Sequence, residues 1–263
     1  MISIDQYAYL SKLKSQDPMV KLVFCLMTLG VCLWADSMIV AVLILMVMGW
    51  YTVCKGGIPF SLWTRLMMIP SSFLMIGVVT IGIHASADPN VFMISIPAAG
   101  TYIGVSQNGL QSAARIFMKA LGAVSCLYYL SLNTPMVDLL QALGKLGVPK
   151  LFTELMGLIY RFIFVFLETA DRMVTAQKSR LGYESPRSGY RSLAALAATL
   201  FIRSYRRADE LYTALEARGY EGEIKVLDTS FNRDRWAYLT PVAVNLALAA
   251  IALFLRRIHG GWS

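Results

Sequence analysis

The fold is organised around the sequence ADRMVTAQKSR at residues 170–180, which recurs as ADELYTALEAR at residues 208–218. The two copies are identical at five of eleven positions, which hold Ala, Asp, Thr, Ala and Arg. After a slip of one residue, Gly182 and Tyr183 match Gly219 and Tyr220. Both copies are rich in helix-forming residues, and a glycine closely follows each terminal Arg, as in a C-terminal cap. The repeat predicts two similar helices that each end in an exposed Arg.

Two interpretations of these terminal arginines are open. An Arg near a helix C-terminus complements the helix dipole by about 0.3–1 kcal/mol, and this role needs no partner. Two similar helices that present Arg180 and Arg218 also suit two equivalent pockets, which a two-fold or pseudo-two-fold partner offers. The dipole does not require Asp and Thr to recur at fixed offsets, so the repeat favours a pair of docking helices.

The composition is that of a polytopic membrane protein. Of the 263 residues, 57% are hydrophobic and only 15% are charged, against about a quarter charged in soluble proteins. The net charge of +8 comes from Lys and Arg concentrated in the hydrophilic stretches, which is typical of cytoplasmic loops. A nucleic-acid surface is therefore disfavoured.

Apolar runs predict an all-α, polytopic membrane helical bundle of about five to six membrane helices, with a cytoplasmic coupling-helix region. The clearest runs are residues 20–34, 38–53, 67–84, 110–132 and 238–255, and the first two read as a tight hairpin. Pro70 lies near the entrance of the third run. Because residues 85–108 hold no Lys or Arg and contain loop-forming Pro and Gly, we expect an external loop there, and residues 171–235 in the cytoplasm.

The run at residues 151–167 is ambiguous. Glu154 and Arg161 lie inside it, and a charge at the centre of a membrane helix costs about 2.5–3.5 kcal/mol on insertion scales. Lys and Arg also flank both ends of this run, and the positive-inside rule places both groups in the cytoplasm. A single full span would put the two ends on opposite sides of the membrane. We expect a helix that packs on the bundle without crossing fully, and the alternative is a further full span.

The expected organisation has three parts. Membrane helices with an N-terminal interfacial helix occupy residues 1–170, cytoplasmic coupling helices occupy 171–235, and a C-terminal membrane helix occupies 236–263. Thr134 is a plausible cap for a short amphipathic helix at residues 136–146. Residues 193–201 place an apolar helical face between the repeats, so three linked cytoplasmic helices are expected. Arg256 and Arg257 would lie outside, against the positive-inside rule.

No catalytic, cofactor or metal site is predicted. A phosphate-binding loop is absent from the sequence, and His84 and His259 stand in unrelated segments, whereas catalytic zinc needs three ligands. The four cysteines and the many methionines are interpreted as packing residues. A transport scaffold is thus preferred to a self-contained channel or secondary carrier, and to a membrane enzyme.

The sequence also resembles a known family. Residues 214–220, ALEARGY, look like the second Ala-Arg-Gly signature of the transmembrane T component of energy-coupling-factor (ECF) transporters, and residues 176–182, AQKSRLG, resemble the first. In the first copy Ser-Arg-Leu replaces Ala-Arg-Gly, so the helix stop is expected to move one residue, to Gly182. The segments DPMVK at 17–21 and LSLNTP at 130–135 are similar too, and the chain looks most like the cobalt (CbiQ) type.

This resemblance implies a non-catalytic subunit of an ATP-driven importer. Family T components join two ATP-binding cassette ATPase subunits to a substrate-binding membrane subunit, here of the cobalt-binding type that serves cobalamin biosynthesis. The carried-over coupling residues, which would enter grooves on the ATPases, are Ser179, Arg180, Leu181, Ala217, Arg218 and Gly219. No cofactor is implied, and the partners include the lipid bilayer of a bacterial or archaeal cell membrane but no nucleic acid. A nickel or vitamin importer is the alternative within the family.

Overall fold

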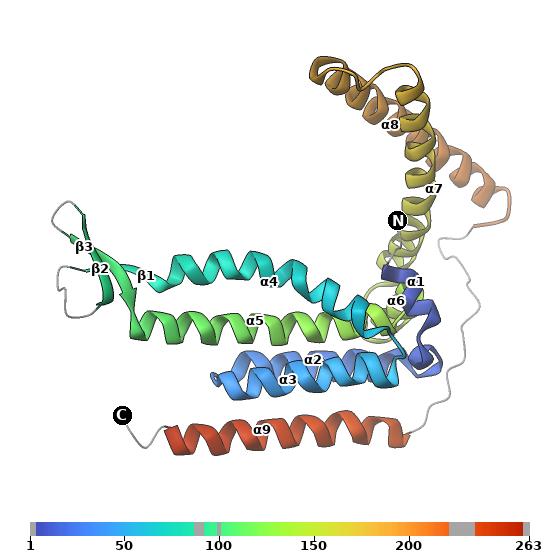
Figure 1. The fold of residues 1–263 in the computed structure, drawn as a ribbon. Helices are drawn as coiled ribbons and strands as arrows, with labels where there is room; N and C mark the ends of the chain where they lie inside the picture. Colours follow the sequence, from blue (N-terminus) through green and yellow to red (C-terminus); the bar gives the residue numbers. More distant parts are fainter. Residues whose placement is uncertain (1–3, 87–91, 99–100, 221–234, 260–263) are drawn as a thin grey trace. The chain divides into compact units, whose positions relative to one another are not determined.

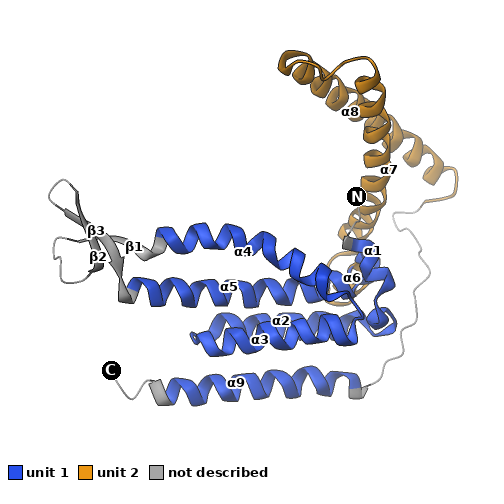
Figure 2. Ribbon diagram, in the orientation of Figure 1, with its two compact units in different colours: residues 1–139, 230–263 blue, residues 140–229 orange. Residues whose placement is uncertain are grey.

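The structure, a computed structural model, describes residues 4–86, 92–98, 101–220 and 235–259 (Figure 1). It divides into two compact units, one of residues 1–139 with 230–263 and one of residues 140–229 (Figure 2). We call them the bundle unit and the coupling unit.

The bundle unit is a set of long, roughly parallel helices (Figure 1). Its α-helices are α1 Ile4–Leu10, α2 Pro18–Trp34, α3 Met38–Trp50, α4 Phe60–Gly82, α5 Gln107–Asn133 and α9 Leu239–His259, with α6 Met136–Lys145 at the chain boundary between the units. Short turns of other helix types are η1 Lys12–Ser15, η2 Tyr51–Lys55 and η4 Arg235–Tyr238.

Four of these segments are long and apolar enough to cross a membrane, namely Met38–Lys55, Phe60–Thr80, Gly109–Asn133 and Leu239–Arg257. The apolar helix Pro18–Trp34 is slightly shorter. The predicted all-α membrane bundle is therefore confirmed, and each of the five predicted runs overlaps one of these helices. Residues 151–167 are not among these segments, and the prediction that they do not cross fully stays a prediction.

Local chemistry sets the helix ends and the core. Asp17 accepts a hydrogen bond from the backbone N–H of Met19 at 3.0 Å, and Pro18 occupies the first turn, so α2 has both start signals. Phe24, only 2% exposed, packs edge-on against Tyr51 and Tyr129, with ring centroids 5.1 and 5.4 Å away. These aromatic contacts join α2, η2 and α5.

Pro70 lies inside α4 rather than near its entrance, because the helix already starts at Phe60. A proline removes the N–H that would bond the carbonyl of Leu66, four residues earlier. The Tyr128 hydroxyl of α5 donates to that carbonyl at 3.2 Å. The neighbouring helix thus satisfies the acceptor that proline leaves free, which is a requirement inside a membrane.

The prediction that residues 85–108 form a loop is wrong for most of the described residues of this segment. They form a small antiparallel sheet of β1 Ile83–Ser86, β2 Phe92–Ala98 and β3 Thr101–Ser106, with the strand order β1-β3-β2. The register pairs Ile83 with Val105 and Ala98 with Thr101. Strand pairing satisfies the backbone groups that an irregular loop would leave to water. Residues 88–90 lie outside the described residues.

The coupling unit contains two long helices, α7 Lys150–Ser179 and α8 Pro186–Glu216. The expectation of three linked cytoplasmic helices is wrong, because α8 runs without a break from the segment between the repeats through the second copy. Each copy of the repeat therefore forms the C-terminal end of one long helix. Neither α7 nor α8 has a buried residue in the described part of the chain.

Two smaller expectations also fail. Thr134 does not cap α6, since its buried hydroxyl has no hydrogen-bond partner among the described residues. Cys54 is exposed, whereas the other three cysteines are buried as expected of packing residues, and all four are free thiols.

Candidate functional site

The first helix end, at the close of α7, is a tight left-handed stop. The carbonyl of Gln177 accepts hydrogen bonds from the N–H groups of Arg180 at 3.1 Å and Gly182 at 2.9 Å. The carbonyl of Lys178 accepts one from Leu181 at 3.0 Å. Leu181 has a φ of 57°, and among described residues other than glycine it alone has a positive φ. This pattern of nested bonds is a Schellman motif.

The second helix end, at the close of α8, repeats the first bond for bond. The carbonyl of Leu215 accepts from Arg218 at 3.0 Å and from Tyr220 at 3.1 Å, and the carbonyl of Glu216 accepts from Gly219 at 3.0 Å. Gly219 has a φ of 73°. Each donor and acceptor lies 38 residues after its counterpart in the first end, so the two arginines are structurally equivalent.

The sequence suggested that the helix stop moves to Gly182, and this prediction is wrong. Leu181 takes the left-handed position of Gly219, although a side chain there costs about 1–2 kcal/mol. At Gly182 a larger residue is excluded for a different reason. A Cβ on it would lie 2.7 Å from Ser192 Oγ and 2.9 Å from the carbonyl of Gln177.

The recurring threonines also have a structural role. Thr175 donates to the carbonyl of Asp171 at 2.8 Å, and Thr213 donates to the carbonyl of Asp209 at 3.0 Å. Both bonds are the back-bonds that a Thr hydroxyl makes to the carbonyl four residues earlier. The identity of the two copies thus extends from the stop into the preceding turns.

Side chains hold the first end against the start of α8. Gln177 donates to the carbonyl of Ser192 at 2.9 Å and accepts from the hydroxyl of Tyr183 at 2.8 Å, while Ser192 donates to the carbonyl of Gly182 at 2.8 Å. Ser185 also caps α8. These bonds fix the turn that carries Arg180.

The structure brings the six predicted residues to the two equivalent stops. Ser179 is the last residue of α7 and donates to the carbonyl of Thr175 at 3.1 Å, and Ala217 directly follows α8. Arg180 and Arg218 are exposed, and neither has an ion-pair partner in the part of the chain that the structure describes. Among the described residues, no ion-pair partner therefore prevents either guanidinium group from binding acceptors outside this chain.

The left-handed Leu181 gives a direct stability test. Leu181→Gly is expected to stabilise the coupling unit by about 1 kcal/mol, because glycine adopts a positive φ without steric strain. The reciprocal variant Gly219→Leu should destabilise by a similar amount. The measurement is the midpoint of thermal unfolding in detergent, and equal midpoints for Leu181→Gly and the wild type would contradict the geometry.

A second polar cluster, which the sequence analysis did not predict as a site, lies within the bundle unit. Lys21 is 1% exposed, and its Nζ donates to the carbonyls of Leu13 at 3.1 Å and Asn133 at 2.9 Å. Ser11 donates to the carbonyl of Gly56 at 3.2 Å and to Asn133 Oδ1 at 2.8 Å. We call Ser11, Lys21, Gly56 and Asn133 the polar junction.

The polar junction joins two segments that carry the family resemblance. Lys21 ends the DPMVK segment and Asn133 stands in the LSLNTP segment, 112 residues away. A lysine inside an apolar run is the signal that could have predicted a buried polar contact. The Lys21 ammonium donates a hydrogen bond to the carbonyl of Asn133 at the end of α5. A carbonyl in the last turn of a helix has no backbone N–H of that helix as a donor.

Within the ranges that the structure describes, no group of three or more His, Cys, Asp or Glu side chains is placed to hold an ion. The chemistry that the two helix ends can perform is binding through exposed guanidinium groups.

Comparison with known proteins agrees with the resemblance. The family model CbiQ, described as cobalt transport protein, matches residues 11–227. The cobalt transport protein CbiQ of Salmonella typhimurium is 37% identical over 161 residues, which are 61% of this chain and 72% of that protein.

Two further relatives span nearly the whole chain. The energy-coupling factor transporter transmembrane protein EcfT of Bacillus selenitireducens is 28% identical over 93% of this chain and 92% of its own length. A putative fused cobalt transport protein, CbiMQ, of Methanocorpusculum labreanum is 27% identical over 98% of this chain but only 41% of its own length. The chain therefore belongs to the CbiQ family of cobalt transport proteins, whose relatives include transmembrane proteins of energy-coupling factor transporters.

Proposed function

We propose that this chain is the transmembrane coupling subunit of an ATP-driven cobalt importer in the cell membrane of a bacterium or archaeon. It joins two ATP-binding cassette ATPase subunits to a separate substrate-binding membrane subunit. The observation that carries the proposal is the pair of equivalent helix ends, each with an exposed Arg at the same position of the same hydrogen-bonded stop. Two equal ends suit two related ATPase subunits.

The proposed partners explain what the chain itself lacks. Its sequence has no phosphate-binding loop, so ATP hydrolysis belongs to the ATPase subunits and the chain is not itself an enzyme. The substrate-binding subunit would capture the ion. The relative named as a fused CbiMQ supports a membrane partner for this chain. This chain matches only 41% of that protein, so a further protein segment is joined to the matching part.

Cobalt is the proposed substrate because the family and two of its named members are described as cobalt transport proteins. The EcfT relative is named for energy-coupling factor transport, with no metal in its name, so nickel or a vitamin is the alternative substrate. In either case the coupling unit performs the same task, since the two helix ends contact ATPases and not the substrate.

Reconstitution tests this proposal. Vesicles that contain the full complex should take up Co²⁺ only when ATP is supplied on the cytoplasmic side, and omission of either partner should abolish uptake. The purified chain alone should neither bind ATP nor pass Co²⁺. A Co²⁺ flux through vesicles that hold only this chain would contradict the proposal and favour a channel or carrier.

A further inference from the structure

The bundle unit has a cavity of about 690 Å³ at the turn between α2 and α3. It is also lined by α5 and α9, so four helices contribute to it. Its lining includes Trp34, Asp36, Met38, Arg115, Leu255 and Arg256. By the predicted topology this turn faces outside, where the positive-inside rule disfavours Lys and Arg.

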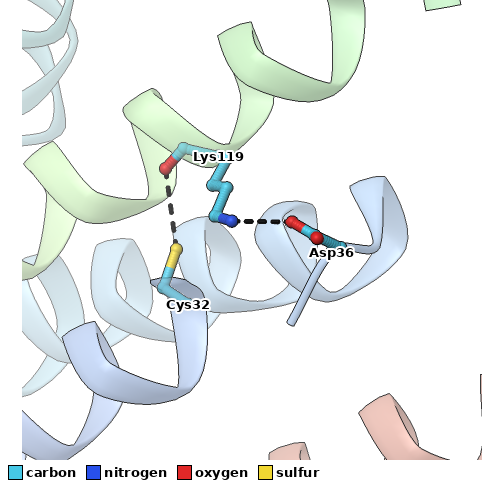
Figure 3. A network of polar contacts seen from close by, with 3 residues as sticks. All are labelled: Cys32, Asp36 and Lys119. Atoms are coloured by element: carbon cyan, nitrogen blue, oxygen red, sulfur yellow. Dashed lines mark hydrogen bonds and ion pairs between the residues drawn. The ribbon is translucent and has the colours of Figure 1, made fainter. Parts of the chain in front are cut away.

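Cations outnumber anions at this cavity. Lys119 of α5 forms an ion pair with Asp36 at 2.8 Å, and the Sγ of Cys32 lies 3.6 Å from the Lys119 carbonyl (Figure 3). The pKa of Asp36 is lowered, first by the hydrogen bond and charge of Lys119 and then by Arg115 and Arg256. Both arginines are exposed and have no ion-pair partner among the described residues. Three cations thus surround one carboxylate, and the cavity attracts anions.

An apolar groove of about 380 Å³ shares Trp34 with this cavity. It lies between α2 and α9, and its lining includes Met27, Gly30 and Val31 of α2 and Val242, Asn245 and Leu246 of α9. A Cβ on Gly30 would have nothing within 4 Å, so the groove is open at that point. Asn245 is 6% exposed, and its Oδ1 has no partner among the described residues.

We propose that the cavity and the groove together bind one anionic phospholipid, with its phosphate at Arg115 and Arg256 and an acyl chain along the groove between α2 and α9. The position beside Trp34 suits an amphiphile, because an aromatic residue at a membrane interface marks the boundary between headgroup and chain. Arg side chains at the end of a helix bundle can hold a phosphate through charge-assisted hydrogen bonds. This site would also explain why cations are kept at an end of the bundle where the charge rule disfavours them, and it is independent of the coupling function.

Native mass spectrometry of the full-length chain tests the site. The protein is released from detergent with equal amounts of dioleoyl phosphatidylglycerol and dioleoyl phosphatidylcholine, which have the same acyl chains. We expect roughly ten-fold preferential retention of the anionic lipid, because Arg115 and Arg256 would repel the trimethylammonium cation of phosphatidylcholine, and phosphatidylglycerol carries no such cation. Arg115→Gln and Arg256→Gln should each remove most of the preference. Asp36→Asn should increase it, because it removes the competing carboxylate and frees Lys119.

Arg257→Gln is the matched control. Arg257 is exposed and directly follows Arg256 in α9, but it does not line the cavity. Its loss should leave lipid retention unchanged, and an equal loss for both arginines would overturn the proposal, because it would show attraction by net charge alone.

Gly30→Leu distinguishes a lipid from a free anion. The leucine side chain should fill the open groove and abolish retention of the lipid. If retention persists in this variant, and millimolar inorganic phosphate displaces the lipid from the wild type, the cavity holds a free anion and the lipid proposal falls. Equal retention of the two lipids by the wild type would also overturn it.

Discussion

Replacement of Arg180 or Arg218 by alanine is expected to weaken retention of the ATPase subunits by roughly ten- to a hundred-fold. The reason is that charge-assisted hydrogen bonds contribute about 1.5–3 kcal/mol each, and each exposed guanidinium would lose its bonds to an ATPase groove. Because the two ends are equivalent in their hydrogen bonding, the two variants should have similar effects. Copurification of the ATPases, with Co²⁺ uptake, measures the change.

Lysine variants separate this account from a dipole effect. Arg180→Lys and Arg218→Lys should restore binding only in part, since Lys keeps the charge but lacks the planar fork that reaches two acceptors. Arg203→Ala, an exposed residue in the body of α8, is the matched control and should leave assembly intact. If Lys restores full binding, or if both Ala variants assemble as the wild type does, the two arginines only complement their helix dipoles, at less than about 1 kcal/mol.

Gly56→Ala is expected to lower the free energy of unfolding more than any other variant proposed for this chain. Gly56 is buried in the polar junction, and an added Cβ would overlap both Asn133 Oδ1 and the backbone carbonyl of Thr52. A backbone atom cannot move aside cheaply, and displacement of Asn133 also weakens its bond from Ser11. Overpacking costs about 1–3 kcal/mol and a lost buried bond about 1–3 kcal/mol more.

Thermal unfolding followed with a thiol-reactive dye measures this effect, because three buried cysteines become accessible when the bundle opens. The matched control is Gly77→Ala in α4, where a Cβ has nothing within 4 Å and alanine favours a helix. An unfolding midpoint for Gly56→Ala as high as that of the Gly77→Ala control would show that the polar junction is not closely packed.

Much of the fold could be predicted because membrane helices depend on length and apolar composition, which are local properties. The runs at residues 20–34, 38–53 and 110–132 became α2, α3 and α5 with small shifts of their ends. The sheet between α4 and α5 could not be predicted in this way. Its strands are stabilised by pairing with each other, and no local signal in residues 92–106 specifies the partner.

The two helix ends that carry the candidate site were predicted from the sequence, but the exact position of the first stop was not. The repeat located both helix ends, because Arg and Gly mark a C-terminal stop. The sequence suggested that the stop shifts to Gly182, since leucine seldom adopts a positive φ. The structure keeps the stop at Leu181, where the bonds from Gln177 and Ser192 and the tight packing around Gly182 hold the turn. Both bonds join the end of α7 to Ser192 of α8, so inspection of the end of α7 alone could not reveal them.

The polar junction was missed for a related reason. Lys21 reads as an isolated charge in an apolar run, and only the folded chain places it beside the carbonyls of Leu13 and Asn133. Contacts over such sequence distances are a property of packing and not of a motif.

The central claim is that the two equivalent helix ends each contact one ATPase subunit. The most direct test is site-specific photo-crosslinking in the assembled complex, with a photoreactive residue placed at Leu181 in one variant and at Gly219 in another. The expected result is that each position crosslinks to an ATPase, and that the two crosslinked peptides come from the same groove of related subunits. Crosslinks from both positions to lipid or to the substrate-binding subunit, with no ATPase peptide from either, would contradict the claim.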